Sequence, residues 1–258
     1  QTWLLNVTPG APVIDGQRWT DVLAEFVAQE IASDPRWDGV YFDNLWGSVA
    51  WIPNAAIDLD RDGRAEDDAT LNARWETGTR ALLTATRTRT PRGFLITGNG
   101  DARYAELTNG LLFEHFPNTE GDWSATMRAY ARVLERAVDP VIAMINVNTR
   151  NTGVQNPQQF RFGLTSTLLG GGYYSFDFGD LEHAQRWWSD AYDIALGDPV
   201  GSAFRIVDVR NASVTRAATE AERRAVAQFA PGVYRRDYAY GLVLVNATTT
   251  EQRVQFDE

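Results

Sequence analysis

Two carboxylates directly follow strongly apolar segments of the sequence. Asp43 follows the run Gly-Val-Tyr-Phe at 39–42, and Glu114 follows the run Gly-Leu-Leu-Phe at 110–113. Runs of this kind are typical of buried strands, so each carboxylate is expected at a strand end. A paired Asp and Glu is the minimal machinery of glycoside hydrolysis, one as nucleophile or base and the other as general acid. The apolar neighbours Phe113 and Phe116 favour a protonated Glu114, which suits an acid. The alternative is a pair of structural carboxylates that bond to nearby backbone or arginine.

Other predicted strands also end in polar residues. The apolar runs at 3–7, 39–43, 93–97, 110–116, 141–147 and 172–178 are expected to be strands. In an α/β barrel the carboxyl ends of the strands form the active site, so these residues would converge on one substrate. The alternative is that polar residues only mark where strands stop. The strand-end set is Asn6, Asp43, Asn44, Asn99, Glu114, His115, Asn146, Asn148 and Asp177.

Amphipathic stretches between these runs predict helices. We expect them at 20–32, at 70–88, after Asp122, after Asn156-Pro157 and at 180–197. Alternation of strand and helix predicts an α/β fold, and both a doubly wound sheet and a (β/α)₈ barrel fit that order. Six strands are two fewer than a barrel needs, and the sequence opens on a strand. We therefore interpret the chain as a TIM-type barrel that lacks its first two βα units.

The sequence changes in character after residue 203. Strands are expected at 204–209, 233–238, 242–246 and 253–256, with a short helix that begins at the capping-box pair Thr219 and Glu222. The predicted domains are thus a catalytic barrel over residues 1–203 and a small β-rich appendage over residues 204–258.

A long loop separates the strand at 39–43 from the next helix. Loops of about 25 residues are usually functional, and this one contains Trp46 and Trp51. These indoles could stack on sugar rings, or they could only anchor the loop. The acidic run 58–68 matches the first half of a calcium loop, with Gly63 at the sixth position, although Ala69 stands where a bidentate acid belongs. We expect one structural Ca²⁺; the alternative is a solvated acidic turn. The predicted ligands are Asp58, Asp60, Asp62, the carbonyl of Arg64, Glu66 and Asp68.

Composition narrows the possible functions. The net charge is −10 and all 24 basic residues are arginine, so nucleic acid is an improbable partner. The chain has no cysteine, which excludes thiolate nucleophiles and zinc–thiolate sites. No apolar run is long enough to span a bilayer, and no phosphate-binding loop or histidine-rich metal centre is present. We therefore expect no membrane insertion and no cofactor for the chemistry.

Several segments resemble one group of proteins. The segment Asp-Gly-Val-Tyr-Phe-Asp-Asn at 38–44 is similar to a strand of bacterial glycoside-hydrolase-like TIM barrels, which include the endo-α-1,4-polygalactosaminidase-like proteins and several uncharacterised families of predicted glycosidases. The strand at 110–114 resembles their second catalytic strand, and 173–178 with Trp187-Trp188 and Tyr192-Asp193 resembles their last strand and helix. The segment 241–246 is similar to their C-terminal β region. The resemblance implies that Asp43 ends the fourth barrel strand and Glu114 the sixth.

These observations together predict a secreted or cell-surface bacterial glycoside hydrolase. We expect Asp43 to be the nucleophile and Glu114 the acid/base, acting on a polysaccharide or oligosaccharide. The predicted substrate-binding residues are Asn6, Asn44, Trp46, Trp51, Asn99, His115, Asn146, Tyr174 and Asp177. The rival hypothesis is a non-catalytic carbohydrate-binding barrel at the cell surface.

Overall fold

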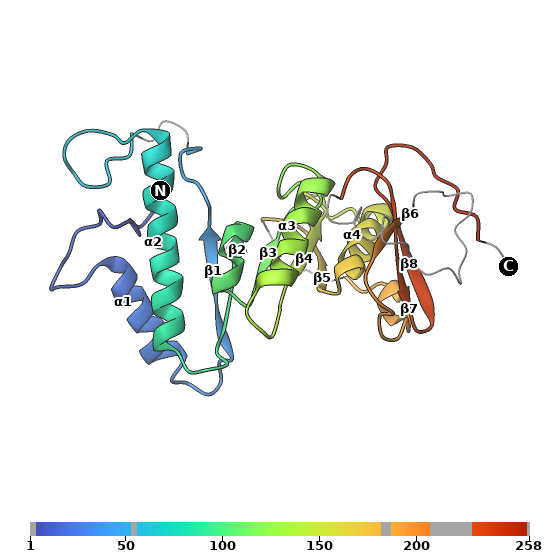
Figure 1. The fold of residues 1–258 in the computed structure, drawn as a ribbon, viewed down its shortest axis with the longest axis horizontal. Coiled ribbons are helices and arrows are strands. Elements are labelled where there is room, and N and C mark those ends of the chain that lie inside the picture. The colour runs from blue at the N-terminus through green and yellow to red at the C-terminus, as the bar shows by residue number, and fades with distance from the viewer. Residues whose placement is uncertain (1–3, 53–55, 182–186, 207–228, 257–258) are drawn as a thin grey trace. The chain divides into compact units, whose positions relative to one another are not determined.

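The computed structural model describes residues 4–52, 56–181, 187–206 and 229–256 (Figure 1). The chain divides into two compact units, one comprising 1–111 with 136–141 and the other 112–135 with 142–258. The boundary predicted after residue 203 falls inside the second unit. In chain order the elements are α1 Trp19–Phe26, a π-helix Val27–Ile31, β1 Gly39–Leu45, α2 Asp68–Arg89, β2 Leu95–Gly100, a 3₁₀ helix Ala102–Leu107, β3 Gly110–Phe113, α3 Trp123–Arg136, β4 Met144–Asn148, α4 Pro157–Gly170, β5 Tyr173–Asp177, a 3₁₀ helix Asp190–Asp193, β6 Phe204–Ile206, β7 Val233–Tyr238 and β8 Gly241–Asn246.

The parallel sheet confirms the predicted alternation of strands and helices. Its strands follow one another in chain order, β1-β2-β3-β4-β5, and a separate antiparallel sheet has the order β6-β7-β8. Among the described residues no pairing joins β1 to β5, so the sheet is not closed into a barrel. The fold is therefore mixed α/β with one parallel and one small antiparallel sheet, and the complete (β/α)₈ barrel remains an interpretation.

The first predicted strand is wrong for the residues that the structure describes. Residues 4–7 form no ladder with another strand, and Leu4 and Leu5 are about half exposed. The Asn6 side chain instead donates to the Leu59 carbonyl and accepts from the backbone of Thr8. An apolar run becomes a strand only where a neighbouring strand accepts its backbone hydrogen bonds, and this segment is held by a loop instead.

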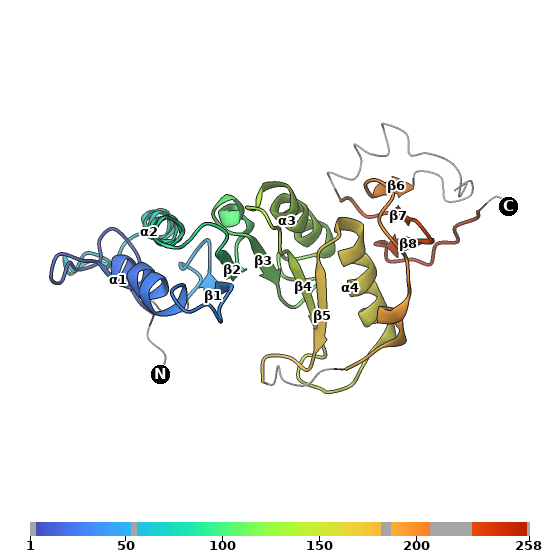
Figure 2. The same ribbon diagram turned by 90° about the horizontal axis from the view of Figure 1, so that it is seen from below.

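In the first unit α1 and α2 lie side by side (Figure 2). The Asp67 side chain caps α2 by accepting from the Thr70 N–H at 3.0 Å. The helix then buries Leu71, Trp75 and Leu83, which lie at helical spacing on one face. The predicted helix at 70–88 is thus confirmed, extended by a few residues at its start.

In the second unit α3 and α4 cover one face of β3, β4 and β5. Phe113 of β3 packs edge-on against Tyr130 of α3, and Phe176 of β5 packs edge-on against Phe160 of α4. Ile145 of β4 is fully buried, and its register partner in β3 is Phe113. Since successive strand residues point to opposite faces, Asn146 and its register partner Ser175 lie on the other face, called here the helix-free face because no described helix of this unit covers it.

The antiparallel sheet of the second unit packs against α4. Arg236 and Tyr238 of β7 both donate to the Leu168 carbonyl near the end of that helix. The strand predicted at 253–256 is not formed, although Val254 and Phe256 still pack on the core of Phe204, Ile206 and Val233. Their burial explains the apolar pattern that suggested a strand.

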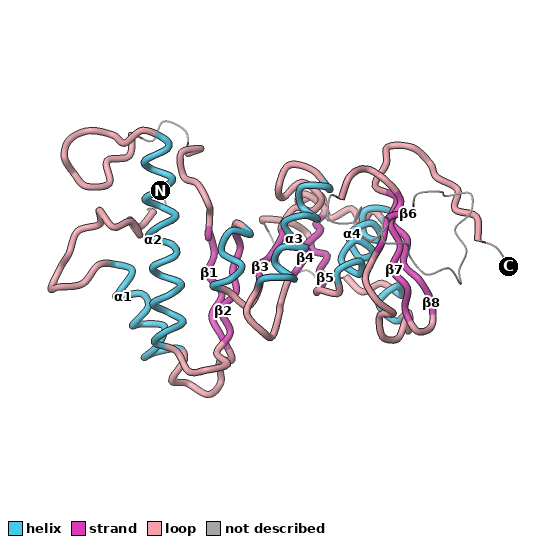
Figure 3. Tube along the Cα trace, in the orientation of Figure 1, coloured by secondary structure: helices cyan, strands magenta, loops and turns pink. Residues whose placement is uncertain are grey.

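Three further predictions fall partly or wholly outside the described residues. The short helix predicted to begin at Thr219 and Glu222 lies wholly outside them, and so do residues 207–209 of the strand predicted at 204–209. Of the helix predicted at 180–197, the described part contains only the short 3₁₀ helix Asp190–Asp193, and the rest is loop (Figure 3). Asp180 therefore does not cap a long helix in the described chain; its carboxylate contacts a histidine, as described below.

Candidate active site

Asp43 and Asn44 lie in a β-bulge at the carboxyl end of β1. The register with β2 shifts between Phe42 and Leu45, and Asn44 adopts a positive φ of 59°. The Asn44 N–H donates to the Asp43 carboxylate at 2.9 Å, and both side chains are exposed. Bulges next to active sites re-aim side chains, because the extra residue interrupts the pleat. The Asp43 carboxylate is thus presented to solvent at the strand end, as a nucleophile requires.

Two glycines of β2 make room for this bulge. A Cβ at Gly98 would lie 2.4 Å from the Phe42 carbonyl oxygen, and one at Gly100 would lie 2.1 Å from the Leu45 carbonyl oxygen. Only glycine permits this approach, so Gly98 and Gly100 are required by the shape of β1. Asn99, a predicted substrate residue, stands half-buried between them at the carboxyl end of β2.

The two tryptophans of the long loop have different surroundings. Trp46 packs half-buried on the core cluster of Val49, Leu59, Leu71 and Trp75, and its carbonyl accepts from the Trp75 indole. Trp51 packs edge-on against Trp46, with ring centroids 5.0 Å apart, and 58% of it is exposed. Trp46 therefore anchors the loop, and Trp51 offers an indole face to a ligand. Asn6, described above, is bonded to the same loop.

The acidic run gathers three of the six predicted calcium ligands. Carboxylate oxygens of Asp58, Asp60 and Glu66 lie within 4.8 Å of one another. The Arg74 guanidinium from α2 binds two of them, at 2.9 Å from Asp60 and 2.9 Å from Glu66. Hydrogen bonding to Arg74 lowers the pKa of Asp60 below its usual range. Arginine thus supplies positive charge where calcium is predicted, and the calcium site stays a prediction.

The remaining predicted ligands lie outside this cluster. The Asp62 carboxylate accepts from the Arg64 N–H, and Asp68 begins α2. Asp58 itself accepts from the N–H groups of Asp62 and Gly63, which closes the turn. The loop therefore satisfies several of its own carboxylates through backbone donors.

In the second unit, polar side chains lie on the helix-free face of β4 and β5. Asn146 is 5% exposed, and its amide donates to Ser175 Oγ at 3.0 Å and Asp177 Oδ2 at 3.1 Å. Asn146 and Ser175 are register partners, as are Asn148 and Asp177. Glu114 directly follows Phe113, the last residue of β3, and its side chain is half-buried. The face of Asn146 therefore carries the Asp177 carboxylate with an amide bonded to it, and Glu114 lies just beyond the carboxyl end of the neighbouring strand.

His115 takes part in a chain of hydrogen bonds beside this face. Its Nδ1 lies 3.0 Å from the Asn148 amide nitrogen, and its Nε2 lies 3.2 Å from Asp180 Oδ1. The Asn148 side-chain oxygen accepts from the Arg150 N–H, so the amide nitrogen faces the imidazole and donates to Nδ1. A neutral His115 must then carry its proton on Nε2, where it donates to Asp180. The chain fixes the orientation of the ring at the end of β3.

Tyr174 lies on the helix-covered face of β5, opposite to Asp177 of the same strand. Its hydroxyl donates to the Phe160 carbonyl at 2.9 Å, and burial raises its pKa. Its neighbour Tyr173 is 60% exposed on the helix-free face. The sequence analysis selected Tyr174 and did not separate the faces of Tyr173 and Tyr174. It also did not select Trp187 and Trp188 as binding residues, although two adjacent indoles after a strand were a signal for them.

A comparison with known protein families identifies the family of the chain. The model of hypothetical glycosyl hydrolase family 15 matches residues 3–242 of the 258 in the chain. The chain belongs to this family. A search of curated proteins finds no match.

Membership in hypothetical glycosyl hydrolase family 15 supports the predicted class of activity at a coarse level. It supports a glycosidase with a carbohydrate substrate, and the resemblance drawn from the strand motifs is confirmed at the level of a glycoside-hydrolase-like family. Within the part of the chain that the structure describes, no helix is long and apolar enough to cross a membrane.

Proposed function

We propose that this member of hypothetical glycosyl hydrolase family 15 cleaves glycosidic bonds, with Glu114 as acid/base and Asp43 as nucleophile. The observation that carries the proposal is the placement of each carboxylate at the carboxyl end of a parallel strand. Asp43 is exposed on a bulge of β1, and Glu114 directly follows the carboxyl end of β3. These are the positions at which α/β barrels place catalytic groups.

The two carboxylates have different surroundings, which supports different roles. Glu114 is half-buried, and Phe113 and Phe116 on either side are buried in the core. Glu114 thus lies beside apolar side chains at the end of β3, where it would donate a proton to the leaving oxygen. Asp43 is exposed and accepts a backbone hydrogen bond, and its carboxylate would attack the anomeric carbon. In this mechanism water then cleaves the glycosyl ester, with Glu114 as base.

Paired variants test these roles on a panel of polysaccharides. Asp43→Asn and Glu114→Gln should each lower the release of reducing ends by at least about 100-fold, the lower end of acid–base contributions. Asp38→Asn at the amino end of β1 and Glu135→Gln on α3 are exposed controls that should keep full activity. Full activity in either active-site variant would refute its assigned role.

Two further measurements separate the alternatives. Retention of the anomeric configuration in the first product, followed by NMR, is expected for a nucleophilic Asp43; inversion would assign it the role of base. Asp177→Asn tests whether the carboxylate on the helix-free face is required. If every glycan that binds is left uncleaved, the chain is a carbohydrate-binding protein and the proposal is wrong.

A further inference from the structure

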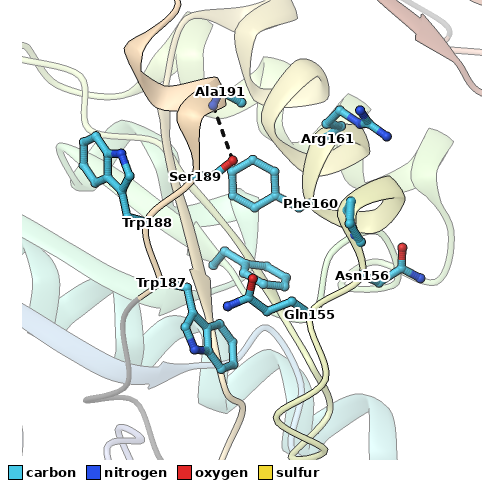
Figure 4. Close-up of a pocket in the computed structure, with 10 residues that line it drawn as sticks. Gln155, Asn156, Phe160, Arg161, Trp187, Trp188, Ser189 and Ala191 are labelled. Atoms are coloured by element: carbon cyan, nitrogen blue, oxygen red, sulfur yellow. Dashed lines mark hydrogen bonds between the residues drawn. The ribbon is translucent and has the colours of Figure 1, made fainter.

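The second unit contains a cavity of about 260 Å³ that the catalytic proposal does not use (Figure 4). It lies between the start of α4 and the segment 187–191 that follows β5. Phe176 contributes to its wall, and Phe176 points to the helix-covered side of β5, opposite to Asp177. The cavity is therefore on the opposite side of β5 from Asp177. The residues used below are Gln155, Asn156, Phe160, Trp187, Trp188 and Ser189.

Aromatic rings form a fixed wall behind the cavity. Phe160 packs edge-on against three rings, with centroids 5.4 Å from Tyr174, 5.5 Å from Phe176 and 5.2 Å from Tyr192. Trp187 in turn packs 5.5 Å from Phe176. Interlocked rings of this kind leave little freedom for the wall to collapse into the cavity.

Trp188 is exposed over 70% of its surface but is held in place. Its ring lies 5.5 Å from Tyr192, and its indole N–H donates to Asp193 Oδ2 at 3.3 Å. Exposure of a large apolar side chain is unfavourable, and here two contacts also restrict its motion. Such a side chain presents a flat, pre-positioned apolar surface to a ligand.

The polar groups at the cavity are fixed by helix and turn capping. The Asn156 side-chain oxygen accepts from the N–H groups of Gln158 and Gln159, which leaves its amide hydrogens for a ligand. The Ser189 hydroxyl accepts from the Ala191 N–H, which leaves its own hydrogen to donate (Figure 4). Gln155 adds an exposed amide. All three groups can pair with hydroxyl groups.

Arg161 is the one charged residue among the described residues that line the cavity. No carboxylate is among the described residues that line it, and the Arg161 guanidinium points away from both indoles in Figure 4. Its volume is below the range of about 300–1,000 Å³ that is common for small-molecule pockets, which favours a ligand of one ring. A flat apolar surface, neutral donors and a small volume together match a neutral pyranose, which has an apolar C–H face and a rim of hydroxyls.

We propose that this cavity binds a neutral sugar unit of a glycan, with the ring stacked on Trp188 and its hydroxyls bonded to Gln155, Asn156 and Ser189. The choice of a glycan rests on the proposed function, and the site itself is distinct from the catalytic carboxylates. It would hold the polysaccharide on the enzyme while another part of the chain is cleaved.

Binding is measured on the full chain with Glu114→Gln, so that a bound glycan is not consumed. The probes are soluble β-glucan, xylan, galactomannan and dextran in affinity electrophoresis, with polygalacturonate as the acidic comparison. Trp188→Ala should weaken binding to at least one neutral probe by about tenfold or more, equivalent to about 1.4 kcal/mol. Trp37→Ala, which removes an indole 59% exposed in the first unit, is the matched control and should bind like its parent.

The outcomes distinguish this site from the catalytic one. Gln155→Ala, on an exposed loop, provides a second variant and should also weaken binding while the melting temperature stays unchanged. Unchanged affinity in both variants, no neutral glycan bound at all, or preference for polygalacturonate would each overturn the proposal. A change from dimer to monomer in Trp188→Ala by light scattering, with glycan affinity intact, would instead assign the surface to protein contact. The catalytic proposal fails separately, if Glu114→Gln still hydrolyses the glycan. The binding assay does not depend on that result.

Discussion

Tyr130 offers the sharpest test of how the second unit is held together. Its hydroxyl is fully buried, donates to the Thr167 carbonyl at 3.0 Å and accepts from the Gly172 N–H at 2.7 Å. It thereby joins α3, the end of α4 and the residue that precedes β5. Burial raises the pKa of the hydroxyl, so it stays a neutral donor at any ordinary pH. Tyr130→Phe removes one oxygen and leaves the ring that packs on Phe113.

The cost of this substitution follows from what each partner loses. The Thr167 carbonyl still accepts from the Gly171 N–H, so it keeps a hydrogen bond. The N–H of the half-buried Gly172 loses its acceptor on the fully buried Tyr130, and a donor left without a partner away from water costs about 1–3 kcal/mol. A loss near 2 kcal/mol lowers the melting temperature of a chain of this size by about 4–8 °C.

Thermal unfolding followed by circular dichroism measures the effect. Tyr240→Phe is the matched control, because Tyr240 is 81% exposed, and its melting temperature should stay within about 1 °C of wild type. Equal melting temperatures for Tyr130→Phe and Tyr240→Phe would refute the reasoning.

Three further predictions concern the first unit. Millimolar Ca²⁺ should raise the melting temperature and EDTA should lower it; an unchanged value with no metal by elemental analysis would assign the acidic run to a turn neutralised by Arg74. Trp51→Ala should weaken binding of the cleaved glycan at an unchanged melting temperature, whereas Trp46→Ala should lower the melting temperature; the reverse would contradict their assignments. Hydrogen bonds from Thr70 lower the pKa of Asp67 below the ordinary value of 3.8 for an aspartate, so its capping contribution is present above pH 3.8 and is lost as the pH falls through the lower pKa of the folded state. The difference in melting temperature between wild type and Asp67→Ala should therefore shrink in acid, and a constant difference from pH 7 to pH 2 would contradict it.

Local patterns in the sequence were sufficient for most of the α/β alternation. The five parallel strands lie within or beside the predicted apolar runs, although β1 and β5 each expose part of one face. The start of α4 was predicted from Asn156-Pro157, and Asn156 does cap it. Asp122 likewise accepts from the Ala125 N–H at the start of α3. Helix caps and apolar runs are set by residues adjacent in the sequence, so they can be predicted from the sequence alone.

Features that depend on distant residues could not be predicted in this way. The run at 3–7 has the same apolar pattern as the other predicted strands. Residues 4–7 nevertheless form no strand, because no neighbouring strand pairs with them. Tyr173 and Tyr174 differ only in the face that each occupies, which is set by the register with β4. The cavity at Trp188 is lined by two segments that lie about 30 positions apart in the sequence, so no local motif predicts it.

The acidic loop shows the same limit in its electrostatics. The spacing of Asp58, Asp60 and Gly63 predicts a cation, because carboxylates gathered in one turn repel one another unless positive charge is near. The structure does place a cation there, but it is the guanidinium of Arg74, which reaches Asp60 and Glu66 from the next helix. A spacing rule includes only ligands within the loop, so it does not detect a positive charge that comes from another element. Calcium must therefore compete with Arg74 for the oxygens of Asp60 and Glu66, which is why the melting experiment and metal analysis have to be read together.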